Sequence, residues 1–149
     1  MTRRIVIRIL VLGAVAGCED DAALDAPEAR DIYARSTELL HALHNEAIAM
    51  PAWPATHALP CPDGGRVVMT TAFATGGTPE DLRHTFDGCV VGGWTLGGDL
   101  DYLGVAVCDD STYSFDIAGS LAVAGRGTCG IDAREMCGVT TGTACGVTL

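Results

Sequence analysis

The stretch LRHTFDGCVVGGWTLGGDLD, residues 82–101, decides the fold class. Short runs with apolar residues at alternating positions lie on both sides of Gly92-Gly93, which is typical of two strands joined by a tight hairpin turn. Similar glycine-punctuated runs extend from Arg66 to the end of the chain. They predict strands over residues 66–74, 82–91, 94–101, 104–108, 112–117, 120–124, 128–134 and 138–147.

The connections between these runs are short and polar. Turn residues stand at 109–111 (Asp-Asp-Ser) and at 125–127 (Gly-Arg-Gly). No segment after residue 66 has the pattern of a crossover helix, which parallel strands need. The sequence therefore predicts a mainly β (α+β) fold, an antiparallel meander of six to eight strands in a curved sheet or a sandwich, with one N-terminal amphipathic helix packed on it. Gly98 and Gly119 are expected to mark bulges or bends.

A single helix is predicted over residues 27–50. Asp25 and Glu28 have the spacing of a capping box, and Pro27 suits the first turn. The helix should end near Met50, because the following proline disfavours helical geometry there. Apolar and small residues recur on one face, which should lie on the sheet: Ile32, Ser36, Leu39, Leu40, Leu43 and Ala47. Residues 51–65, with four prolines and a final Gly-Gly, predict a connector without regular structure.

The N-terminus has the pattern of an export signal. Residues 1–17 combine three arginines, an apolar run over 9–16 that is too short to span a bilayer, and small residues at the end. The sequence Val-Ala-Gly-Cys at 15–18 resembles the lipobox of bacterial lipoproteins. That resemblance implies cleavage before Cys18 and acylation of its thiol and new amino group, with diacylglycerol and a fatty acid such as palmitate. Two or more chains make a stable membrane anchor.

The mature chain would begin with an acidic tether, residues 18–26. An Asp directly after the lipidated cysteine tends to hold a bacterial lipoprotein in the inner membrane. Here that position is Glu19, so the outer membrane is expected. The alternative is a plain secretory signal with an incidental cysteine.

Charge excludes one broad class of function. The chain has 9 basic and 19 acidic residues, and every basic residue is arginine. Removing Arg3, Arg4 and Arg8 with the signal changes the net charge from −10 to 6 − 19 = −13. Nucleic-acid binding needs clustered cations that neutralise phosphates, so a nucleic-acid partner is not expected.

The cysteine count predicts disulfides. Apart from Cys18, the chain contains an even six cysteines: Cys61, Cys89, Cys108, Cys129, Cys137 and Cys145. An even number in an exported domain predicts three disulfide bonds within residues 66–149 and the connector before them. Six cysteines allow 15 pairings, and the sequence does not choose among them. A zinc site is the weaker interpretation, because the nearest cysteines are eight residues apart rather than two to four.

Several short motifs resemble those of one group of proteins. They are Cys-Pro-Asp-Gly-Gly (61–65), Thr-Phe-Asp-Gly-Cys (85–89), Ile-Ala-Gly-Ser-Leu-Ala-Val-Ala-Gly (117–125) and Thr-Gly-Thr-Ala-Cys-Gly (141–146). Together with the lipobox and the helix, they resemble uncharacterised predicted lipoproteins of myxobacteria-like Gram-negative bacteria, which carry a cysteine-containing, glycine-rich β-meander domain. The resemblance covers most of residues 61–146 and implies no activity.

Signals for chemistry are weak. Glu38 and His41 match one quarter of a di-iron motif, but such sites need acidic residues from three further helices, and His41 should face solvent. His57 and His84 have no recognisable nucleophile beside them, and no Gly-x-Ser-x-Gly elbow occurs. We therefore expect no catalytic residues and no cofactor.

Four acids form a weak candidate for a hard cation. Asp99 and Asp101 alternate to one face of a predicted strand, and Asp109 and Asp110 occupy the next turn. The solubility of an acidic exported domain explains the same residues.

The sequence as a whole predicts a lipid-anchored cell-envelope protein with a structural or interaction role, whose partner is an envelope protein or surface component. A first alternative is a carrier that binds an apolar ligand or lipid in a curved sheet. Its cavity would be lined by residues such as Val67, Met69, Phe73, Phe86, Trp94 and Phe115. A second alternative is a hydrolase without a recognisable motif.

Overall fold

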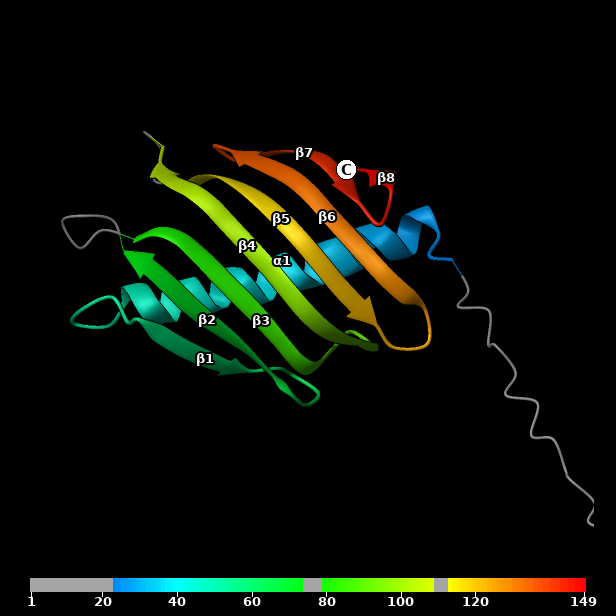
Figure 1. The fold of residues 1–149 in the computed structure, drawn as a ribbon, viewed down its shortest axis with the longest axis horizontal. Helices are drawn as coiled ribbons and strands as arrows, with labels where there is room; N and C mark the ends of the chain where they lie inside the picture. The colour runs from blue at the N-terminus through cyan, green and yellow to red at the C-terminus, as the bar shows by residue number, and fades with distance from the viewer. Residues whose placement is uncertain (1–22, 74–78, 109–112) are drawn as a thin grey trace, which may run out of the picture.

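The fold is a single antiparallel sheet with one long helix across it (Figure 1). The computed structural model describes residues 23–73, 79–108 and 113–149. Its elements are α1 (Ala26–Ile48), β1 (Thr56–Pro60), β2 (Arg66–Phe73), β3 (Pro79–Val91), β4 (Trp94–Val107), β5 (Tyr113–Val123), β6 (Gly127–Met136), β7 (Val139–Ala144) and β8 (Val147–Thr148). The strands pair in chain order from β1 to β8. This confirms the predicted antiparallel meander with one helix. The prediction allowed a curved sheet or a sandwich, and the described strands form one open sheet.

The helix begins as the sequence predicts. The Asp25 side chain accepts a hydrogen bond from the Glu28 backbone N–H, and the Glu28 carboxylate accepts one from the Asp25 N–H, both at 2.9 Å. This capping box satisfies two backbone donors that the first turn leaves free. The helix ends at Ile48, just before Met50 and the proline that follows it.

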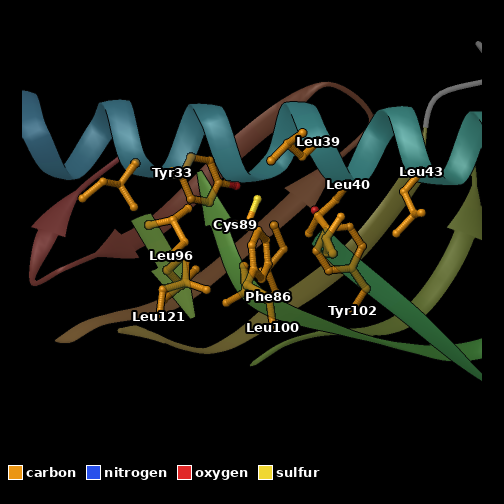
Figure 2. Packing of buried hydrophobic residues seen from close by; sticks show 14 of the residues in the cluster. Tyr33, Leu39, Leu40, Leu43, Phe86, Cys89, Leu96, Leu100, Tyr102 and Leu121 are labelled. Carbon is orange, nitrogen blue, oxygen red and sulfur yellow. The ribbon is translucent and has the colours of Figure 1, made fainter. Parts of the chain in front are cut away.

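We call the face of the sheet that α1 covers the inner face, and the opposite one the outer face. The predicted helical stripe is buried against the inner face, with Ile32, Leu40 and Leu43 fully inaccessible. Figure 2 shows these leucines above side chains from the central strands. The residues that meet them include Phe86, Cys89, Leu96, Leu100, Tyr102 and Leu121. Each fully buried leucine or isoleucine contributes about 1.5–3 kcal/mol, so this contact is the main source of stability.

The prediction that residues 51–65 lack regular structure is wrong, because β1 forms there as an edge strand. The Thr71 N–H donates to the Ala55 carbonyl at 2.9 Å, and the indole N–H of Trp53 donates to the Thr71 hydroxyl at 2.9 Å. Pro60 is the last residue of β1. A proline is tolerated at that place on an edge strand, so the proline content did not exclude pairing.

Two predicted breaks between strands are also wrong. Residues 94–101 and 104–108 belong largely to one strand, β4, whose pairing with β5 shifts register between Leu103 and Ala106 and then resumes. Residues 112–117 and 120–124 likewise fall largely within β5. At Gly119 a Cβ atom would lie 2.2 Å from the Asp99 carbonyl oxygen, so glycine is what lets β5 and β4 pair without a break. The predicted turn at 109–111 lies outside the described residues.

Three disulfides are present, and they join Cys61 to Cys89, Cys108 to Cys137 and Cys129 to Cys145. The sequence separations are 28, 29 and 16 residues. Closing loops of this length stabilises a fold by about 3–4 kcal/mol each in the chain-entropy account. The bonds connect the β1–β2 turn to β3, the residue after β4 to the β6–β7 turn, and β6 to the β7–β8 turn, so together they reach across most of the sheet.

The three disulfides differ in accessibility. Cys61, Cys89 and Cys129 are buried, whereas Cys137 is exposed in the β6–β7 hairpin turn. Its φ of +50° is unusual for a residue other than glycine. Thiol–disulfide exchange requires that the attacking thiolate reach a sulfur atom.

We therefore expect a mild thiol reductant to open Cys108–Cys137 first. Partial reduction of the native protein, followed by alkylation and peptide mass spectrometry, should label Cys108 and Cys137 before the other four disulfide-bonded cysteines. Earlier labelling of Cys61 and Cys89 would contradict the packing described here.

Candidate functional site

A pair of histidines connects the helix to the centre of the inner face. His44 comes from the last third of α1 and His84 from the middle of β3. Their Nε2 atoms lie 2.8 Å apart, which is hydrogen-bond distance. His84 is fully buried and His44 is half-buried at the edge of the helix contact.

The protonation of this pair follows from one backbone contact. The Nδ1 atom of His84 lies 3.2 Å from the Leu100 carbonyl oxygen, which can only accept. A neutral His84 therefore carries its proton on Nδ1 and presents the Nε2 lone pair to His44. His44 in turn donates its Nε2–H to His84, so each ring has a defined tautomer.

Burial keeps both rings neutral. It lowers the pKa of His44 from 6.5 to about 3, with smaller contributions from the positive forms of His84 and His41. Burial also lowers the pKa of His84 from 6.5 to about 4, although the Leu100 carbonyl and the Asp101 carboxylate partly oppose it. Transfer of a charged imidazolium out of water is the dominant cost in both cases.

Aromatic rings surround the pair. The Tyr102 ring lies 4.7 Å from the His84 ring and 5.4 Å from the His44 ring, in edge-on arrangements, and it stacks on Phe115 at 4.3 Å. Trp53 lies farther out, 6.5 Å from His44. In the part of the chain that the structure describes, no hydroxyl or thiol bonds to either imidazole, so the geometry offers ligand lone pairs and a shared proton rather than an activated nucleophile.

The other histidines lie outside this cluster. His41 is exposed on α1, as the sequence predicts. His57 lies in β1 on the inner side of the sheet and its Nε2 is 3.1 Å from the Glu46 carboxylate.

Asp99 and Asp101, the weak candidates for cation binding, lie side by side on the outer face of β4. Their carboxylates are already bonded: Asp99 accepts from the Thr85 hydroxyl at 2.6 Å, and Asp101 accepts two bonds from Arg83 at 2.8 and 2.9 Å. The Arg83 guanidinium holds the pKa of Asp101 below its usual value. No group of three or more His, Cys, Asp or Glu side chains among the described residues could hold a metal. Asp109 and Asp110, the other two candidates, lie outside those residues.

Cross-strand ion pairs continue along the outer face. Arg66 bonds to Asp87 at 3.1 Å, and Arg134 makes two bonds to Asp116 at 2.6 and 3.0 Å. In both pairs, as in Arg83 and Asp101, the partners are directly opposite each other in register. Such exposed pairs contribute little to stability, because water and salt screen them. They fix the positions of charges on the outer face more than they stabilise the fold.

Most residues proposed to line a carrier cavity belong to the core. Val67, Met69, Phe86 and Phe115 are buried in the cluster beneath α1. Trp94 is half-buried, and its indole N–H donates to the Asp31 carboxylate at 2.7 Å. The side chain of Phe73 lies outside the described part. In the described structure these side chains pack against the helix, and the carrier function stays a prediction.

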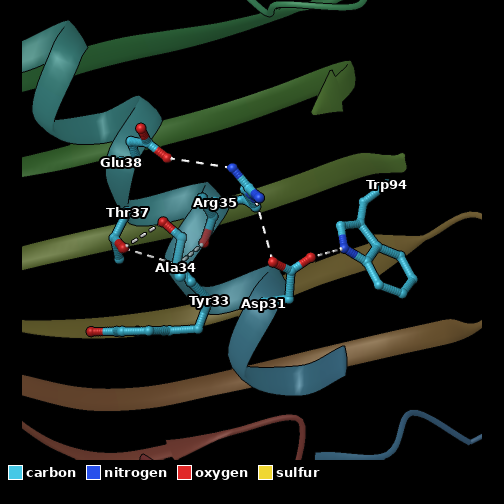
Figure 3. A network of polar contacts seen from close by, with 8 residues as sticks. Asp31, Tyr33, Ala34, Arg35, Thr37, Glu38 and Trp94 are labelled. Atoms are coloured by element: carbon cyan, nitrogen blue, oxygen red, sulfur yellow. Dashed lines mark hydrogen bonds and ion pairs between the residues drawn. The ribbon is translucent and has the colours of Figure 1, made fainter. Parts of the chain in front are cut away.

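A polar network holds the first half of α1 over the sheet (Figure 3). Asp31 accepts from Trp94 and also lies 3.4 Å from the Arg35 guanidinium, which reaches towards Glu38. At the helix start, Glu28 forms an ion pair with Arg126 of the β5–β6 turn. These contacts fix where α1 crosses the inner face, and thereby which strand residue His44 meets.

Comparison with protein-family models, curated proteins and solved structures finds no match to this chain. The three disulfides are typical of an oxidising, exported environment. Among the described residues, no helix is long and apolar enough to cross a membrane.

The histidine pair was not predicted from the sequence. A signal was present, since His84 stands between the inward-facing Leu82 and Phe86, and His44 follows Leu40 by four residues on the helix. Each histidine alone resembles an ordinary core or boundary residue. Only the crossing position of α1 on the sheet brings the two rings together.

The histidine pair should make the fold sensitive to acid. Both rings have a lower pKa in the folded protein than in the unfolded chain, so below about pH 6.5 the unfolded chain binds more protons. The contribution of the pair to the free energy of unfolding is therefore fully present above that pH and falls as the pH decreases towards 4. This free energy should fall by up to about 1.4 kcal/mol per pH unit for each histidine.

Denaturant unfolding between pH 7 and pH 4.5 measures this slope. In His44→Gln the amide can still donate to His84 but does not titrate, so the part of the slope due to His44 should disappear. His41→Gln, one turn earlier on the exposed side of α1, is the control and should keep the wild-type slope. An unchanged slope in His44→Gln would show that the pair does not control acid stability.

Proposed function

We propose that this chain is a lipid-anchored protein of the cell envelope, held in the outer membrane through Cys18, and that it has a structural or interaction role. The observation that carries the proposal is the asymmetry of the sheet. Its inner face is covered by α1, whereas its outer face is broad, exposed and lined with charged and hydroxyl side chains. A broad, exposed face offers contact area to another surface, whereas sites that enclose a ligand are concave.

The outer face has a defined charge pattern. Six aspartates lie with three arginines on it: Asp81, Asp87, Asp99, Asp101, Asp116 and Asp132, with Arg66, Arg83 and Arg134. The excess is negative, and threonines and Ser120 lie between the charges. This pattern favours a partner that presents basic groups, because complementary charge steers association and determines orientation.

The proposed anchor limits the position of this surface. Six residues lie between Cys18 and the helix cap Asp25, and the seven steps from one to the other span at most about 25 Å when fully extended. A lipidated Cys18 would therefore keep the domain close to the membrane. The outer face would then meet partners that are themselves at the envelope.

Lipidation is the first test. Full-length protein in its native host should incorporate labelled palmitate, and globomycin, which blocks the lipoprotein signal peptidase, should cause the precursor to accumulate. Cys18→Ser should abolish both effects, whereas the disulfide-bonded cysteines remain in place in this variant. An unlabelled wild-type protein that is released from membranes by salt alone would contradict the proposal.

The interaction surface is tested by photo-crosslinking in intact cells. A photoreactive residue at Ser120, exposed in the middle of the outer face, should give one discrete adduct with an envelope component. The same residue at Ala34, exposed on the solvent side of α1, is the matched control and should give none. Equal adducts at both positions, or no adduct from Ser120, would contradict an interaction role for the outer face.

A further inference from the structure

We propose that His44 and His84, with the thioether of Met69, form a binding site for monovalent copper between the helix and the sheet. The starting observation is that two imidazole Nε2 atoms from different elements point at each other at 2.8 Å. Both rings are neutral, and neutral imidazole is the form that binds metals. The proton between them occupies the place that a metal ion would take.

The surroundings of His84 match those of a metal ligand. Metal-binding histidines almost always donate their other ring N–H to a carboxylate, a backbone carbonyl or water, which fixes the ring and its tautomer. His84 does this through Nδ1 and the Leu100 carbonyl at 3.2 Å. Its Nε2 lone pair is therefore held in one direction, towards His44.

A soft donor lies beside the pair. Met69 of β2 is the direct register partner of His84 of β3, and both side chains are buried on the inner face. Directly opposite residues of antiparallel strands have Cβ atoms about 4.5–5.5 Å apart, so the thioether is within reach of the His84 ring. Two imidazoles and a thioether favour Cu⁺, since thioethers select soft ions and imidazoles bind copper well.

Binding requires a small rearrangement. Metal–nitrogen bonds of about 2.0–2.1 Å place two ligand nitrogens about 3.3 Å apart in a tetrahedral site and about 4 Å apart in a linear one. The Nε2 atoms must therefore separate by about 0.5–1.2 Å, and half-buried His44 is the ring with room to move. The Nε2 proton of His44 moves to its Nδ1, so the ring stays neutral and its Nε2 lone pair becomes free. No oxidant or reductant is needed.

The experiment uses the full chain in detergent with its disulfides intact, and anaerobic Cu⁺ in competition with a chromogenic Cu⁺ chelator. The wild type should hold one Cu⁺ per chain. His44→Gln, which keeps the hydrogen bond to His84, and Met69→Leu, which keeps the core volume, should each weaken binding at least tenfold. His41→Gln should bind as the wild type does, and melting curves without metal confirm that each variant is folded.

Wild-type protein provides a test that needs no variant. In NMR spectra, addition of one equivalent of Cu⁺ should shift the imidazole resonances of His44 and His84 and the methyl resonance of Met69, and leave those of His41 and His57 in place. The proposal is overturned if the chelator keeps all the copper, if His41→Gln weakens binding as much as His44→Gln, or if Met69→Leu has no effect.

Discussion

The structure depends on the contact between the apolar stripe of α1 and the inner face of the sheet. All eight described strands belong to one sheet, and α1 is the element that covers its inner face. A sheet that buries one face needs a second layer, because exposure of side chains such as Leu100 and Leu121 would remove most of the hydrophobic stabilisation. Three contacts along the helix fix how it lies: Glu28 with Arg126, Arg30 with the Thr148 carbonyl, and Asp31 with Trp94.

This two-layer arrangement gives the two faces different chemistry. The inner face is a hydrophobic core that also contains polar side chains, among them the pair of His44 and His84, where burial suppresses charge. The outer face is the reverse, with exposed carboxylates and guanidinium groups at register positions set by the strands. Interactions with other molecules are therefore expected on the outer face. Proton or ion chemistry is expected at the histidine pair, between the helix and the sheet. All three disulfides lie within the sheet layer and link strands that are neighbours or next neighbours in it.

The sequence predicts most of the fold and little of the site, for physical reasons. The capping box of α1 and its buried stripe follow from local spacing, so they were predicted residue by residue. Strand β1 was missed because proline content is a local signal, whereas edge pairing with β2 depends on Trp53 and Thr71, which are distant in sequence. The break predicted between residues 117 and 120 was wrong because the sequence does not show that β4 lies close to Gly119, where only glycine fits. The disulfide pairing and the meeting of the two histidines depend on register and helix crossing, which no local pattern contains.

The most direct measurement of the contact between the layers is proton NMR of the oxidised protein at neutral pH. Nuclear Overhauser cross-peaks should connect the Tyr102 ring to the imidazoles of both His44 and His84, whose centres lie 5.4 and 4.7 Å from it. The amides between Ile32 and Leu43 should exchange as slowly as those of the central strands, because the helix and sheet open together. Fast exchange along the helix, with no cross-peaks from Tyr102 to His44, would show that α1 does not cover the sheet.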